Sequence, residues 1–123
     1  CIVRIAPYDV RLDDGVTVQP DVMVICDKDK LSDDLRCYGA PDWVIEVASS
    51  NAKYDLYTKQ QLYRRYGVRE YWVIGPNQEL VFVFLFEKGD IIRLYDWNDT
   101  IPVGIYEDAP VPLSLRIADL VTA

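Results

Sequence analysis

Polar and apolar positions between Gly39 and Gly75 follow first a strand period, then a helical period, then a strand period again. From Asp42 to Ala48 the side chains alternate between two faces, as in a β-strand. From Asp55 to Tyr66 the apolar positions recur at about 100° per residue, as in an amphipathic helix. An apolar strand follows Gly67. A strand–helix–strand crossover packs its helix on the sheet formed by the two strands, so the three elements are predicted to form one unit.

Two charged residues interrupt the apolar positions of this unit. Glu46 shares a strand face with Val44 and Ala48, and Lys59 lies in the middle of the helical apolar stripe. An ammonium in a core-facing stripe either reaches a carboxylate or costs stability, because it loses much of its hydration. The crossover could bring the helix over the face that carries Glu46. The pattern therefore predicts a buried pair between Glu46 and Lys59.

Shorter patterns on both sides extend the sheet. Strands are predicted at Ile2 to Ile5, Tyr8 to Leu12, Val22 to Cys26, Leu80 to Glu87 and Ile91 to Trp97. The continuous apolar run from Val22 indicates a strand buried on both faces, and the last two strands form a β-hairpin. A short helix is expected from Leu115 to Val121. The predicted fold class is α/β, a mixed sheet with one principal helix and a C-terminal β-hairpin.

Composition narrows the class of protein. A chain of 123 residues, half of them apolar, is expected to form a single domain over residues 1–123. No apolar run approaches the length of a membrane span and no secretory leader is visible, so we expect no membrane partner. Three cysteines without a Cys-x-x-Cys pair favour a reducing, cytoplasmic location and argue against structural zinc. The absence of histidine excludes Ser-His-Asp and Cys-His triads.

The net charge of −7 argues against nucleic acid as a partner, because phosphate neutralisation dominates such binding. The charge is unevenly distributed, however. Between Lys53 and Glu70 there are five basic residues against two acidic ones, and Arg64 and Arg65 point away from the apolar stripe. These arginines either contact nucleic acid or form an ordinary solvated helix face.

Asp21 adds a second carboxylate to the candidate site. It follows Pro20 at the start of a buried strand, and Glu46 lies in the next buried strand. Two carboxylates with a lysine suit Mg²⁺, which prefers oxygen ligands, together with a cationic stabiliser of a phosphoryl transition state. The alternative is structural: Asp21 caps a strand, and Glu46 and Lys59 form a satisfied buried ion pair.

An ordered series of motifs resembles the Uma-type family of putative restriction endonucleases, within the PD-(D/E)XK nuclease superfamily. The motifs are Pro20-Asp21-Val-Met-Val-Ile-Cys, Gly39-Ala-Pro-Asp-x-Val-Ile-Glu46-Val-x-Ser49, Lys53-Tyr-Asp55-x3-Lys59-x3-Tyr63 and Gly67-Val-x-Glu70-Tyr-Trp-Val-Ile. The resemblance extends from about Ile5 to the end of the chain. It implies a restriction-endonuclease-like fold.

The resemblance also implies roles for individual residues. Asp21 and Glu46 would be catalytic residues that bind Mg²⁺, with Mn²⁺ as an alternative, and the main-chain carbonyl of Val47 would be a third metal ligand. The superfamily lysine is expected two residues after Glu46, where this chain has Ala48, so Lys59 from the helix would replace it as the third catalytic residue.

Tyr63 lies one turn after Lys59 and resembles the tyrosine of a Gln-x3-Tyr helix motif in related exonucleases. Tyr63 and Arg64 are accordingly the candidates for substrate binding. Family members usually carry an N-terminal segment with a further acidic residue, and the resemblance implies that this chain lacks it.

Two classes of function follow. The first is a Mg²⁺-dependent endonuclease that hydrolyses phosphodiester bonds of nucleic acid. The second is a catalytically silent member of the same fold that serves binding or assembly.

The hairpin strand also predicts self-association. Phe82, Phe84 and Phe86 alternate with Val81, Val83 and Leu85, so both faces of the strand are apolar. One principal helix covers one face. An uncovered aromatic row on a strand is an interaction surface, and a two-fold homodimer is the commonest solution.

Overall fold

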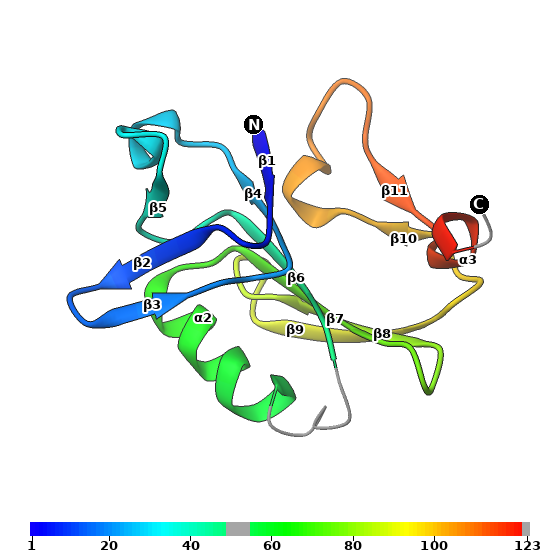
Figure 1. Cartoon of the computed structure of the whole chain (residues 1–123). Helices are drawn as coiled ribbons and strands as arrows, with labels where there is room; N and C mark the ends of the chain where they lie inside the picture. The colour runs from blue at the N-terminus through cyan, green and yellow to red at the C-terminus, as the bar shows by residue number, and fades with distance from the viewer. Residues whose placement is uncertain (49–54, 122–123) are drawn as a thin grey trace.

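A six-stranded sheet forms the centre of the molecule (Figure 1). The computed structural model describes residues 1–48 and 55–121. The strands lie in the order β1 (Ile2–Ile5), β4 (Val22–Ile25), β6 (Trp43–Val47), β7 (Glu70–Gly75), β8 (Leu80–Leu85) and β9 (Ile91–Asp96). β6 and β7 are parallel, whereas the other neighbours in this sheet are antiparallel. The predicted mixed sheet and C-terminal hairpin are confirmed.

Smaller elements flank the central sheet. The additional strands are β2 (Asp9–Asp13), β3 (Val16–Val18) and β5 (Arg36–Tyr38), which form one sheet, and β10 (Ile101–Pro102) and β11 (Ser114–Leu115), which form another. The helices are η1 (Lys28–Leu31), η2 (Asp55–Lys59), α2 (Gln60–Tyr66), η3 (Gly104–Tyr106) and α3 (Ile117–Val121). Figure 1 shows α2 and the β10–β11–α3 segment on different sides of the central sheet.

The predicted crossover connects β6 to β7 through α2. Its helix is less regular than the sequence period suggests, because η2 is a π-helical turn and the α-helix begins only at Gln60. Gly67 ends the helix with a φ of +94°, and its N–H donates to the carbonyls of Tyr63 and Arg64. Glycine adopts this left-handed conformation without a Cβ penalty, which lets the chain turn directly into β7. Lys53 lies outside the described residues.

Alternation along β6 and β7 builds two separate cores, one on each face of the sheet. Val44 and Tyr71 face α2 and pack with Tyr63, whereas Trp43 and Trp72 face the C-terminal segment. The predicted assignment of β6 residues to the two faces is therefore confirmed. β4 is also buried on both faces, as its continuous apolar run predicts.

The aromatic row on β8 is not uncovered as the sequence analysis expects. Val81 and Val83 are buried by the C-terminal segment, which contributes Ile101, Val103 and Ile117 to the same core. On the helix side Phe84 is 3% exposed and stacks on Tyr71. The proposed reason for a dimer is thus corrected: residues after the hairpin fold back and cover the face that α2 leaves open.

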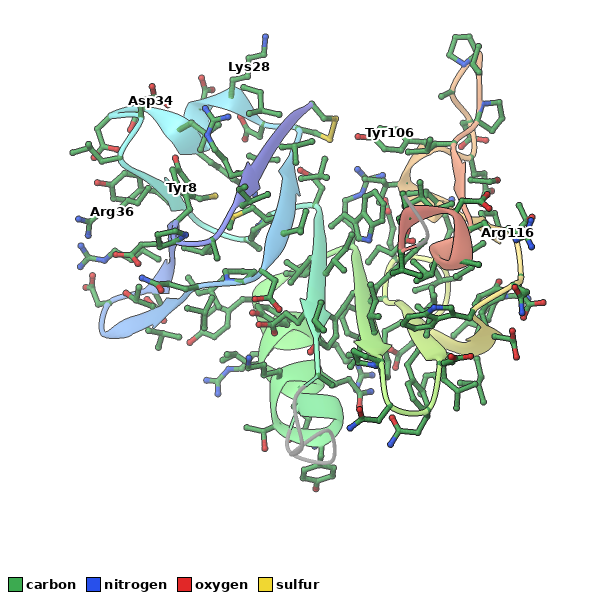
Figure 2. All side chains as sticks on the ribbon, turned by 45° about the vertical axis from the view of Figure 1, so that its right-hand side comes forward. Tyr8, Lys28, Asp34, Arg36, Tyr106 and Arg116 are labelled. Carbon is green, nitrogen blue, oxygen red and sulfur yellow. A yellow bond between two sulfur atoms is a disulfide. The ribbon has the colours of Figure 1, made fainter. Side chains whose placement is uncertain are left out.

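The cysteines also differ from expectation. Cys1 and Cys26 form a disulfide that joins the start of the chain to the end of β4, visible as the yellow bond in Figure 2, and Cys37 is a buried free thiol. The odd cysteine count therefore does not mean that all three are reduced. Among the described residues, no helix is long and apolar enough to span a membrane.

Candidate active site

Glu46 is the centre of the candidate site. It lies on β6 facing α2 and is only 4% exposed, because the strand period places it on the same face as the buried Val44 and Ala48. A buried carboxylate requires donors to replace its lost hydration. Both of its oxygens have them.

Among the described residues, three side chains contact Glu46, one each from η2, α2 and β7. Lys59 binds Oε1 with its Nζ at 2.9 Å, as the sequence pattern predicts. Tyr63 and Tyr71 donate their hydroxyls to Oε2, at 3.2 Å and 3.4 Å. The Lys59 side chain is 30% exposed, so the Oε1 side of the carboxylate, which binds the lysine, faces outward. The Oε2 side, which binds the two tyrosine hydroxyls, faces the core.

Burial sets the protonation behaviour of this group. Desolvation raises the pKa of Glu46, an effect that Lys59 and Tyr63 oppose and the nearby charge of Asp21 reinforces. Desolvation and the adjacent Glu46 also raise the pKa of Tyr63, which stays a neutral phenol and a hydrogen-bond donor. The site therefore contains a carboxylate that accepts a proton more readily than a solvated one.

Asp21 lies beside Glu46 at the edge of the site. Its Oδ2 accepts the backbone N–H of Val47 at 2.7 Å, and its own carbonyl accepts the N–H of Ala6. β4 pairs antiparallel with β6, with Val22 opposite Ile45, so one further step along both strands places Asp21 opposite Glu46. The structure thus brings Asp21, Glu46 and Lys59 together from three separate parts of the chain.

The oxygen donors are of the type that Mg²⁺ prefers, and two carboxylates with water and phosphate oxygens form a usual ligand set. Among the described residues, no cluster of three or more histidine, cysteine, aspartate or glutamate side chains could hold a metal. Asp21 and Glu46 therefore fit a cation that keeps several non-protein ligands. The N–H of Val47 is used by Asp21, and the ligand role of its carbonyl remains a prediction.

The two residues expected to bind substrate are placed differently from each other. Tyr63 is 0% exposed and contacts Glu46, so its hydroxyl supports the carboxylate and cannot reach a substrate at the surface. Arg64 is on the exposed side of α2, where its guanidinium pairs with Asp90 at 2.6 Å. Contact between Arg64 and a substrate phosphate would require breaking this surface pair.

Tyr71 is a site residue that the sequence analysis missed. It lies on β7 opposite Val44, two positions from the residue that pairs with Glu46, and therefore faces the same side of the sheet. Alternation along β7 combined with parallel pairing to β6 was the available signal. The hydroxyl contact itself depends on the relative positions of two strands, which the period does not specify.

A second buried carboxylate, Glu70, was also missed. It is 1% exposed on the opposite face of β7, and it accepts Nε1 of Trp72 at 2.6 Å and the N–H of Ile105 at 3.0 Å. Desolvation raises the pKa of Glu70, and the hydrogen bonds from Trp72 and Ile105 only partly offset this rise. Because its partners belong to the core and to η3, Glu70 anchors the C-terminal segment. In the part of the chain that the structure describes, no cationic side chain is hydrogen-bonded to it.

The described residues form an α/β protein whose mixed central sheet carries a buried carboxylate–lysine pair. A family model described as Uma2, putative restriction endonuclease, matches residues 1–103, and the chain belongs to this family. The match ends at residue 103, just after β10, although the motif resemblance was expected to continue to the end of the chain.

A solved structure supports the same fold. The crystal structure of a putative nuclease belonging to DUF820 from Anabaena variabilis matches with a TM-score of 0.71 and 22% sequence identity. The match covers 98% of this chain and 67% of that chain. No curated protein is significantly similar to this chain.

Proposed function

We propose that this protein is a Mg²⁺-dependent endonuclease that hydrolyses phosphodiester bonds of nucleic acid. The observation that carries the proposal is the pairing of Lys59 with the buried Glu46 beside Asp21. Family membership supports the same class of activity.

Asp21 and Glu46 would hold the cation, Mg²⁺ or alternatively Mn²⁺, with the Val47 carbonyl as the further proposed ligand. When bound, the cation would polarise the phosphoryl oxygen and lower the pKa of a bound water. Lys59 holds a cationic donor at the exposed side of Glu46, where it can orient a water and stabilise negative charge that develops on a phosphoryl oxygen. Tyr63 keeps the inner oxygen of Glu46 hydrogen-bonded throughout.

The test is cleavage of labelled DNA duplex, single-stranded DNA and RNA with Mg²⁺, Mn²⁺ or a chelator. Glu46→Gln and Lys59→Met are expected to reduce turnover by about a hundred-fold or more, since one lost electrostatic stabiliser costs roughly 3 kcal/mol. Divalent cation should raise the melting temperature of the wild-type protein but not of Glu46→Gln, by mass action.

Two matched controls separate chemistry from folding. Lys88→Met removes a lysine of similar exposure, 32% against 30%, that pairs with Glu107 at the surface. Glu70→Gln alters the buried carboxylate on the opposite face. Both controls should retain the wild-type rate per folded molecule, and equal loss in Lys88→Met and Lys59→Met would contradict the proposed site.

The alternative is a catalytically silent protein of this fold that binds nucleic acid or assembles with a partner. The absence of a third acidic side chain among the described residues near the site favours it. Salt-sensitive retention of a labelled duplex without turnover in any cation would support this alternative.

A further inference from the structure

Tyr71 occupies a position that the proposed chemistry does not yet use. Its side chain is 0% exposed, with its ring 4.9 Å from that of Tyr63 and 5.6 Å from that of Phe84. Its hydroxyl lies 3.4 Å from Oε2 of Glu46. The neighbouring rings fix the direction of the phenol, so the hydroxyl is held toward the carboxylate.

The supports of Glu46 come from two independent parts of the fold. Lys59 and Tyr63 belong to the η2–α2 helical segment, whereas Tyr71 belongs to β7, the parallel neighbour of β6. A shift of the helix would move Lys59 and Tyr63 together. The contact with Tyr71 would persist, because the β6–β7 hydrogen bonds fix Tyr71 relative to Glu46.

The division of donors between the carboxylate oxygens has a chemical consequence. Both phenols bind Oε2, while the partly exposed Lys59 binds Oε1. A glutamate side chain has several rotatable bonds, and side chains that hold it in one rotamer preorganise it as a ligand. Oε1 is therefore the oxygen presented toward the accessible side.

We propose that Tyr71 is a positioning residue, which fixes Glu46 against the sheet so that Oε1 is presented to the catalytic cation. This proposal rests on the proposed function of Glu46 as a metal ligand. Hydrogen-bond partners of metal ligands commonly contribute ten-fold or more to metal affinity.

Tyr71→Phe tests this proposal because it keeps the packed ring and removes only the hydroxyl. Mn²⁺ affinity is measured by calorimetric titration, together with the Mn²⁺ concentration that gives half-maximal cleavage. The matched control is Tyr95→Phe, which alters a half-buried tyrosine that packs in the core on the opposite face. We expect about a ten-fold loss of Mn²⁺ affinity in Tyr71→Phe, an unchanged KM for nucleic acid, and no change in the control.

Unchanged Mn²⁺ affinity in Tyr71→Phe, with or without a lower urea midpoint, would overturn the positioning role and leave Tyr71 as a packing residue. A wild-type protein that neither binds Mn²⁺ nor cleaves would contradict the proposed function instead. The interaction between Tyr71 and Glu46 would then be measured by urea melts of Tyr71→Phe in the wild-type protein and in Glu46→Met. A smaller loss in that background supports Tyr71 as the holder of Glu46, and equal losses overturn it.

Discussion

Glu46 and Glu70 show how two buried glutamates on neighbouring strands can have different uses. Glu70 is held by a tryptophan N–H and the N–H of Ile105, which are fixed in the core and in η3. Glu46 is held by two phenols and by Lys59, whose side chain reaches solvent. Fixed donors suit an anchor, whereas a partly exposed cation beside a preorganised carboxylate suits chemistry.

Removing Glu46 should destabilise the protein more than removing its partner Lys59. Lys59→Met leaves a carboxylate whose raised pKa lets it take up a proton, and methionine refills much of the volume, so we expect a loss of about 1 to 2 kcal/mol. Glu46→Ala leaves a cavity and strands three donors, for a loss of about 3 kcal/mol or more. Urea melts at pH 7 measure both. The reverse order would contradict the burial of Glu46.

Glu70 should make stability depend on pH. Its folded pKa lies above the ordinary value of 4.5, so the native state binds more protons than the unfolded state just above that pH. Stability from this group is therefore fully present below pH 4.5 and is lost as the pH rises through the folded pKa. Urea melts between pH 4 and pH 8 should show Glu70→Gln gaining stability relative to wild type as the pH rises. A constant difference between the two proteins would contradict the raised pKa.

The β6–α2–β7 unit could be predicted from sequence because the patterns that determine it lie within short, consecutive stretches of the chain. Alternation in β6 and the helical period after Asp55 fix which side chains face each other, and the parallel crossover then brings Lys59 to Glu46. The π-helical turn of η2 could not be predicted, since the apolar positions after Asp55 recur at the period of a regular α-helix. The contact of Glu70 with Ile105 could not be predicted either, because η3 begins 34 residues after Glu70, beyond the β8–β9 hairpin.

Two glycines lie at helix ends, Gly67 after α2 and Gly104 at the start of η3, and substituting them should have different costs. Gly67 has a φ of +94°, and an added Cβ would meet no atom within 4 Å, so Gly67→Ala should cost about 1 kcal/mol from backbone conformation alone. In Gly104→Ala the new Cβ would lie 2.8 Å from Oε1 of Glu70, which must move and weaken its bond to Ile105. We expect a larger loss, about 2 kcal/mol or more. Urea melts of both variants provide the comparison, and equal or smaller loss in Gly104→Ala would show that η3 adjusts freely.

At the scale of the whole molecule, the C-terminal segment changes which surface is left apolar. It covers the Val81 and Val83 face of β8, and α2 covers Phe84 on the other face. On β9, which forms an edge of the central sheet, Ile92 and Leu94 are 58% and 57% exposed. They lie opposite Phe84 and Phe82 in the β8–β9 register, so the unprotected apolar row sits one strand further out than the sequence pattern suggests.

The dimer predicted from sequence is therefore expected to use β9. Two copies can pair their edge strands antiparallel about a two-fold axis, which satisfies the free backbone groups and brings Leu94 of each copy together. Size-exclusion chromatography with light scattering over a range of concentrations should show a dimer that Leu94→Lys dissociates. Val111→Lys, at an 84% exposed position outside the central sheet, is the control and should leave the dimer intact. A wild-type monomer at every concentration would contradict self-association, and a dimer that tolerates Leu94→Lys would place the interface elsewhere.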